Sequence, residues 1–497
     1  MASELGASYG VGMPDPADRP SERVRVPPPL ISRRIASGRG ATEQPNAGGD
    51  GEAALTPRFW GAVLFTGVAA GLFGVAMMAL LTTVEHIGFG YDSGSFASGV
   101  EQASGLRRVV ALLVAGVIGG LGWYLLRRCT KGQRAEADEA AWFGSALSWP
   151  RSLGTSVLSE IVIGLGASLG REAAPKLMGA VSGSVLARWT GMDAGQRRLL
   201  VACGAGAGLA AVYDVPLAGA LFTAEIMIGV ITLPVALPAL VCSGVATVTA
   251  WVYLPAQATY LGVPDYAFTP SALVWAMLAG PVIGLVAVAF IRMVAVVSHH
   301  RASGRLVLVA PLVAFGVLAG VGQVFPQLFG NGKGIALDAF LGTTGVWLLL
   351  ALFVLKPLVT ALCLGSGASG GLLTPTLATG AALGGLLGIV WSALWPGTPV
   401  GVFALVGAAA MLGAGMQAPL TALVLVLELT GTGFGLTVPL VVATALATAV
   451  ARRVDGYSIY SGRLAALPSS VGRSEGAGEG LQSEARGRDQ HPQNRAE

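Results

Sequence analysis

The sequence predicts an all-α protein that crosses a lipid bilayer many times. Of its 497 residues, 53% are hydrophobic and only 12% are charged, and the mean hydropathy is +0.68. A chain of this composition would be insoluble if most of its surface faced water. It also contains 72 glycines, about twice the average share of about 7%. Such a glycine content suits helices that pack closely or break inside a membrane.

The two ends of the chain differ in composition from its middle. Residues 1–57 combine prolines, charges and glycines with little apolar surface, so we expect a disordered N-terminal tail. That polar start lacks the apolar segment of a signal peptide. Residues 465–497 are rich in Ser, Gly, Glu and Arg, and we expect a second disordered tail, too short and polar for a regulatory domain. Residues 58–464 are therefore predicted to form the transmembrane domain.

Long apolar stretches fill the region between the tails. Several reach the length of about 20 residues that a helix needs to span the hydrocarbon core. Others are cut by Gly and Pro into pieces that are too short to cross. Irregular backbone is not tolerated against lipid, so these breaks must face protein or a wet cavity. The stretches lie at about 59–84, 107–126, 153–170, 198–232, 235–254, 271–297, 305–325, 345–364, 376–395, 400–430 and 436–451.

An internal repeat links two distant parts of this domain. Residues 204–226 align without a gap on residues 407–429, with a Pro and a Glu at matching positions in both. Upstream of each block, residues 166–180 resemble residues 367–381, with the proline displaced by one position. Similar Gly, Ala and Leu content could produce some likeness by chance. The shared order and spacing favour a true repeat.

The repeat predicts two halves of inverted topology, at about 59–254 and 271–464, whose broken helices meet at mid-membrane. Each paired block has glycines, then a Pro, then an apolar helix, which indicates a loop that leads into a helix start. A helix N-terminus exposes unpaired N–H groups and about half a positive charge. Two such ends that converge inside a membrane would bind an anion, so the predicted substrate is anionic.

Glu172 lies in the first of these loops, within Gly170-Arg171-Glu172. A carboxylate at the mouth of an anion site can occupy that site in place of the substrate, and protonation would release it. Glu172 is therefore a candidate gate. The alternative is a plain helix N-terminal charge or an ion pair with Arg171.

Four segments resemble motifs of the CLC family of chloride channels and chloride–proton antiporters. GREAAP at 170–175 resembles the GREGP or GKEGP loop that carries the external gate, and GSGASGGLLTP at 365–375 resembles the GSGAPGGIFAP loop. APLTALVLVLELT at 418–430 and GYSIYSGRL at 456–464 resemble the matching helix and the final helix start. The resemblance runs from about 59 to 464. It implies a CLC-type fold in a divergent, bacterial-type member without cytoplasmic regulatory domains.

Position by position, the resemblance assigns the gate to Glu172, backbone N–H donation to Leu372 and Leu373, and a hydroxyl contact with the anion to Tyr460. Tyr457 is the weaker choice for the hydroxyl, and an interfacial aromatic anchor is the alternative role for Tyr460. The other residues that the resemblance places at the anion site are Gly170, Arg171 and Ala173.

The chain departs from the family pattern at three places. The GSGIP loop, whose serine contacts the anion in the family, should fall near 130–134, where Lys131 takes the serine's place. That lysine would either point into the pore or attract anions from the cytoplasmic side. In the gate loop, Ala173 replaces a glycine and the proline arrives one residue late. The internal proton-relay glutamate is replaced by Ile226, whereas Glu225 and its repeat mate Glu428 are predicted to cap or pair helices.

These observations predict transport of chloride or a similar small anion through a pore in each subunit, gated by protonation of a glutamate. The resemblance implies a homodimer in the cell membrane with both termini cytoplasmic. Proton-coupled antiport is one alternative, and a secondary carrier of a different anionic solute or a non-transporting scaffold are others. We expect no enzymatic activity, no cofactor, no metal and no nucleic-acid partner, since the four cysteines are scattered and basic residues cluster at segment ends.

Overall fold

The computed structural model describes residues 55–130 and 147–464, which are almost entirely helical. Most of both predicted tails, and Lys131, lie outside these ranges. The α-helices of the first half are α2 (Pro57–Phe89), α3 (Phe96–Gln102), α4 (Gly105–Cys129), α6 (Trp149–Gly164), α7 (Ala173–Trp189), α8 (Ala194–Tyr213), α9 (Pro216–Leu221) and α10 (Leu233–Ala250). A π-helix, η2 (Phe222–Ile228), continues α9.

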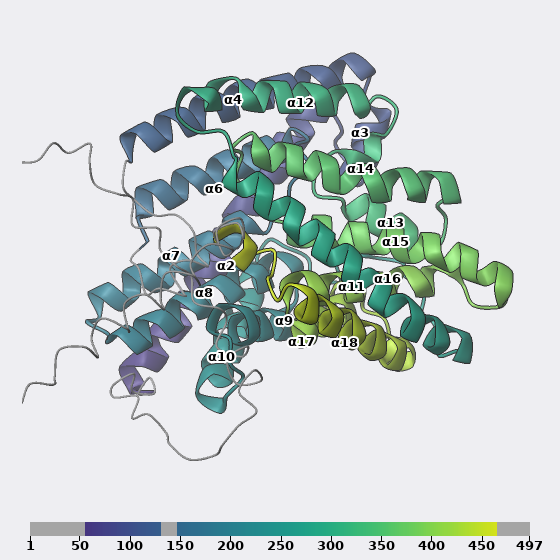
Figure 1. Ribbon diagram of the computed structural model, residues 1–497. Helices are drawn as coiled ribbons and strands as arrows, with labels where there is room; N and C mark the ends of the chain where they lie inside the picture. Colours follow the sequence, from purple (N-terminus) through teal and green to yellow (C-terminus); the bar gives the residue numbers. More distant parts are fainter. Residues whose placement is uncertain (1–54, 131–146, 465–497) are drawn as a thin grey trace, which may run out of the picture. The chain divides into compact units, whose positions relative to one another are not determined.

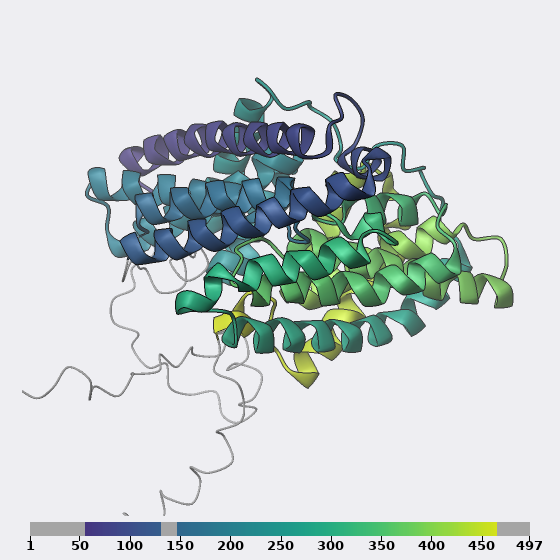
Figure 2. The ribbon, with the colours of Figure 1, turned by 90° about the horizontal axis from the view of Figure 1, so that it is seen from above.

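The second half has the same character. Its α-helices are α11 (Pro270–His299), α12 (Ala310–Val321), α13 (Lys333–Phe340), α14 (Val346–Gly365), α15 (Leu373–Leu394), α16 (Val400–Met416), α17 (Pro419–Thr430), α18 (Thr437–Val454) and α19 (Ser461–Leu464). Short 3-10 helices are η3 (Gly304–Leu308), η4 (Pro326–Leu328) and η5 (Phe434–Leu436). Seen from above, the purple and blue helices of the first half lie mainly to one side of the green and yellow helices of the second (Figure 2).

Eight described segments are long and apolar enough to span a bilayer, which agrees with the predicted polytopic membrane protein. Three apolar helical segments are shorter, namely α9 with η2, α16 and α17. These short pieces are the predicted broken helices, and all of them belong to the repeated blocks. The eight candidate spans are α2, α4, α10, α11, η3 with α12, α14, α15, and η5 with α18.

Equivalent helix pairs form the interior of each half. Helix α7 packs against α8 in the first half, and α15 packs against α16 in the second (Figure 1). The first pair crosses where Gly179 meets Gly204, and the second crosses where Gly380 meets Gly407. A Cβ at any of these glycines would collide with the carbonyl oxygen of its partner. The glycines therefore allow the close backbone approach expected of membrane helices, and they occupy matching positions in the repeat.

The predicted internal repeat is confirmed by contacts that each half makes reciprocally with the other. Glu428 of α17 caps the first turn of α9, and Glu225 of η2 caps the first turn of α17. The capping role predicted for both glutamates is thereby confirmed, and Thr421 adds a hydroxyl bond to Glu225 at 2.7 Å. The N–H donors are Leu217 at 3.0 Å and Ala218 at 2.7 Å to Glu428, and Leu420 at 3.3 Å and Thr421 at 2.7 Å to Glu225.

Two further pairs of repeat mates adopt matching geometry. Gly170 and Gly371 exchange two backbone hydrogen bonds, N–H to C=O in both directions, each of 2.7 Å. Asp214 and Gln417 end α8 and α16, and both adopt the left-handed conformation with φ of 58°. Residue-for-residue reciprocity of this kind is the signature of a two-fold relation. The two halves therefore meet about an approximate two-fold axis within one chain.

The offset proline of the first loop has a simple structural reason. Pro175 lies in the third position of α7, and Pro375 lies in the third position of α15. The shift seen in the sequence is therefore a shift of the helix start by one residue. Proline is tolerated in both places because the first turn of a helix has N–H groups without intrahelical partners.

Glu428→Ala should destabilise the protein, because it leaves two N–H groups at the start of α9 without their acceptor. Hydrogen bonds to a charged group are worth about 1.5–3 kcal/mol, so we expect a clear drop in the apparent melting temperature of the detergent-solubilised protein. Glu428→Gln, which keeps one acceptor oxygen, should lie between this variant and the wild type. Glu101→Ala, at an exposed residue of α3, is the control. Equal melting of all four proteins would contradict the capping role.

Candidate functional site

Two loops that are equivalent in the repeat meet in the interior of the protein. One connects α6 to α7 and contains Gly170, and the other connects α14 to α15 and contains Gly371. The hydrogen bonds between these two glycines hold the loops edge to edge. As a result, helices α7 and α15 both begin at the junction of the halves. This is the arrangement that the repeat predicted for an anion site.

The carboxylate of Glu172 lies against the N-terminus of α15. Glu172 is the residue before α7, but its side chain makes no capping bond to its own helix. One carboxylate oxygen accepts a hydrogen bond of 2.8 Å from the Leu373 N–H, and the other accepts bonds from the hydroxyls of Tyr213 at 3.2 Å and Thr374 at 3.3 Å. Only 4% of Glu172 is exposed. A buried carboxylate is thus held by three neutral donors.

These donors are suited to an inorganic anion as well as to a carboxylate. The N–H of Leu373 belongs to the first turn of α15, where helix N–H groups and the helix dipole favour negative charge. The space is also matched to the carboxylate, since a Cβ at either Gly170 or Gly371 would collide with it. The Leu373 N–H and the hydroxyls of Tyr213 and Thr374 thus form a cup for negative charge, which the Glu172 carboxylate occupies. A mobile anion could enter this cup only after the side chain leaves.

Tyr213 and Thr374 contact the Glu172 carboxylate, although no sequence motif pointed to either residue. The Tyr213 hydroxyl lies 2.8 Å from the Thr374 hydroxyl as well as near Glu172. A signal was present, because Tyr213 aligns in the repeat with Met416 and immediately precedes the residue that ends α8 in the left-handed conformation. Its contact with Glu172 depends on how α8 and α15 pack, which the repeat alone does not specify.

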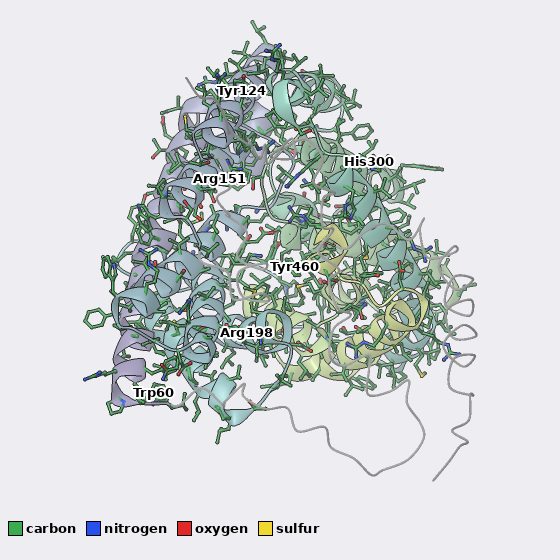
Figure 3. All side chains as sticks on the ribbon, turned by 60° about the vertical axis from the view of Figure 1, so that its left-hand side comes forward. Trp60, Tyr124, Arg151, Arg198, His300 and Tyr460 are labelled. Atoms are coloured by element: carbon green, nitrogen blue, oxygen red, sulfur yellow. The ribbon has the colours of Figure 1, made fainter. Side chains whose placement is uncertain are left out.

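Tyr460 lies on a second side of this interior region. Its ring contacts Phe222 edge to face, with centroids 5.9 Å apart, and its hydroxyl lies 3.9 Å from the Met416 sulfur. The Lys176 ammonium lies 4.7 Å from its ring centroid. Figure 3 shows Tyr460 among the helices, whereas Trp60 near the start of α2 lies at the edge of the view. With 7% exposure, Tyr460 is not an interfacial anchor.

The remaining candidate residues surround the cup in different ways. Gly170 uses its N–H for the bond to Gly371 O, and the Arg171 guanidinium lies 5.1 Å from the centre of the Tyr213 ring rather than against Glu172. Ala173 is the first residue of α7, and Leu372 is the buried residue before α15. Anion contacts of these residues remain predictions. Lys131 lies outside the described residues.

Two cationic side chains, Lys356 and Arg127, donate hydrogen bonds to the two loops that meet at Glu172. The ammonium of Lys356, fully buried on α14, donates to Ser168 Oγ at 2.8 Å and to the carbonyls of Gly330 and Leu328 at 2.7 and 3.3 Å. Arg127 of α4 donates to the carbonyl of Gly367 in the second loop. Neither role was visible in the sequence, because Lys356 lies within an apolar stretch and Arg127 belongs to a basic pair at the end of one.

Another carboxyl group is buried near Glu172. Glu160 of α6 is fully buried, and its two carboxyl oxygens have no hydrogen-bond partner among the residues that the structure describes. Arg171, Glu85 and Glu172 are the charged groups that act on it electrostatically.

The position of the proton-relay residue of the family is occupied by an apolar side chain in the structure. Ile226 lies in the π-helix η2 and is 8% exposed. Its neighbour Glu225 is engaged in capping α17. Neither residue therefore supplies a free internal acid.

Comparisons with known proteins show which family this chain resembles. A family model described as voltage gated chloride channel matches residues 118–452. The chain is 30% identical over 411 residues to the voltage-gated ClC-type chloride channel ClcB of Salmonella typhimurium, which covers 79% of this chain and 96% of that protein. It is 29% identical over 368 residues to the H(+)/Cl(−) exchange transporter ClcA of Vibrio campbellii, covering 71% and 78% respectively. The structure of a slow cyanobacterial Cl−/H+ antiporter matches with a TM-score of 0.72 and 25% identity, over 83% of this chain and 98% of that one.

Proposed function

Because the chain belongs to the voltage-gated chloride channel family, we propose that it carries chloride or a similar small inorganic anion across a lipid bilayer along a pathway that Glu172 closes. The observation that supports this most strongly is the position of the Glu172 carboxylate. It fills a cup formed by the Leu373 N–H and the hydroxyls of Tyr213 and Thr374. A carboxylate and a mobile anion would compete for these same donors.

Protonation of Glu172 is the proposed opening step. The ionised carboxylate gains charge-assisted hydrogen bonds, which are about twice as strong as neutral ones. The neutral acid loses this advantage, so an incoming anion can displace it and accept the N–H of Leu373 in its place. Low pH on the accessible side would then favour an open pathway.

We propose passive conduction as the main mode, and the apolar residue at the relay position supports it. Ile226 cannot carry a proton, and Glu225 is engaged in capping a helix. Proton-coupled exchange is the second candidate, since the matched cyanobacterial protein of known structure is an antiporter. Exchange in this chain would require a proton route that avoids Ile226.

We further propose a homodimer in the cell membrane with both termini in the cytoplasm. The family resemblance supports the dimer. Basic pairs support the orientation, because Arg127-Arg128 ends α4 and Arg452-Arg453 ends α18, the last long helix before the C-terminal tail. We propose no enzymatic role and no cofactor beyond the transported anion.

Glu172→Gln should pass anions faster than the wild type at neutral pH, because its neutral side chain mimics the protonated gate. Chloride efflux from liposomes that contain the purified protein, recorded together with pH, tests this. We expect wild-type efflux to rise several-fold as the pH falls and the variant to show little pH dependence. Glu101→Gln, at an exposed glutamate, is the matched control and should behave as the wild type.

Three outcomes of this measurement are informative. Chloride efflux without proton movement in either protein establishes passive conduction. Uphill proton movement in the wild type, lost in Glu172→Gln, establishes exchange and shows that Ile226 is bypassed. No flux of any small anion from well-folded protein would overturn the proposed function.

Tyr213→Phe should raise chloride efflux at neutral pH. The substitution removes a hydroxyl donor to the Glu172 carboxylate, so the carboxylate leaves the cup more readily. One hydrogen bond to a charged group is worth about 1.5–3 kcal/mol, so we expect efflux to rise several-fold. Tyr253→Phe, at an exposed tyrosine, should leave efflux unchanged. Slower efflux from Tyr213→Phe would contradict the role of Tyr213.

A further inference from the structure

Lys176 is a buried cation that lies along the same helix as the gate. It follows Glu172 by four residues, and its N–H donates to the Glu172 carbonyl at 3.2 Å. Residues four apart share one face of a helix and are separated by about one turn, or about 6 Å, along the axis. The face of α7 that presents Glu172 to the cup therefore presents Lys176 one turn further along the helix.

The surroundings of the Lys176 ammonium are aromatic. Its nitrogen lies 4.7 Å from the ring centroid of Tyr460 and 5.5 Å from that of Phe222, and the residue is only 9% exposed. Both distances are within the range of cation–π attraction. The two rings pack edge to face on each other, so together they hold the ammonium at a defined point. Lys176 comes from α7, Phe222 from η2, and Tyr460 from the segment before α19.

The position of α7 at this point is tightly constrained. A Cβ at Gly208 of α8 would collide with the carbonyl of Pro175 and approach the N–H of Lys176. The α8 backbone thus lies close against the backbone of Pro175 and Lys176. The segment of Tyr460 is fixed as well, since the Ile459 N–H donates to the Gly415 carbonyl at 2.8 Å. The ammonium and the Tyr460 ring are therefore held together by the packing of both halves.

We propose that Lys176 is a cationic ligand of an inner anion site, one helical turn from Glu172, that it shares with the hydroxyl of Tyr460. This inference rests on the proposed function, because it concerns the same anion pathway. An ammonium offers three donors and a full charge, whereas the Tyr460 hydroxyl offers one donor and no charge.

The charge changes what such a site can do. A hydroxyl pair selects an anion by hydrogen-bond geometry, whereas an ammonium attracts any small monovalent anion and holds it more strongly. Tight binding slows departure, because conduction requires a site weak enough to release its ion. We therefore expect high anion affinity and a low maximal transport rate from the Lys176 site.

Calorimetric titration of purified protein with chloride and bromide tests the proposal. The titrations use the Glu172→Gln protein, so that the gate carboxylate does not compete. Adding Lys176→Met should weaken anion binding about tenfold or more, since a charged hydrogen-bond partner is lost. Lys176→Arg should restore most of the affinity, and Lys176→Gln should resemble Lys176→Met.

Arg188→Met is the matched control, because it removes the same charge from the last turn of α7, where Arg188 is exposed. Its affinity should equal that of the parent. If Lys176→Met does not fold, the comparison of Lys176→Gln with Lys176→Arg gives the same answer. Equal anion affinity with lysine, arginine, glutamine and methionine at this position would overturn the role of Lys176 and leave the proposed transport intact. Absence of anion binding and of anion flux in the parent protein would instead overturn both.

Discussion

The reciprocal contact between the two halves is the constraint on which the rest of the structure depends. Each half supplies a glutamate that caps a short helix of the other half. The first N–H groups of these helices have no intrahelical partner, and Leu217 and Leu420, which supply two of them, are about half exposed. A hydrogen bond to a charged group is worth about 1.5–3 kcal/mol. Glu225 and Glu428 each supply the missing acceptor to a helix of the other half. These hydrogen bonds also fix the register between the two halves.

That register also determines the geometry around Glu172, the proposed gate. Because Gly170 and Gly371 exchange backbone hydrogen bonds, the loop that carries Glu172 lies against the start of α15. The Glu172 carboxylate therefore accepts a direct hydrogen bond from the Leu373 N–H, which belongs to the other half. The placement of Glu172 at the junction is thus a consequence of the inverted repeat, since two of its three donors, Leu373 and Thr374, belong to the other half.

The repeat is not symmetrical in its side chains, and the differences lie around Glu172 and Tyr460. Glu172 of the first half has no acidic counterpart in the second loop, and Tyr213 is matched by Met416. Both Tyr213 and Met416 face the interior, but the first contacts Glu172 and the second contacts Tyr460. A symmetrical scaffold therefore carries an asymmetrical set of polar groups, with Lys176 and Tyr460 on one side of the cup and Tyr213 and Thr374 around it.

The sequence by itself determined the membrane class, the repeat, the capping role of Glu225 and Glu428, and Glu172 as the candidate gate. These follow from local pattern, because apolar length, glycine and proline punctuation and repeat spacing are properties of contiguous residues. It did not point to Tyr213, Thr374 or Lys176, and only the tertiary structure decided which residues they contact. Their partners lie on other helices. A hydroxyl or an ammonium in an apolar helix acquires its role from the neighbouring helix, and helix packing depends on distant contacts that no local pattern encodes.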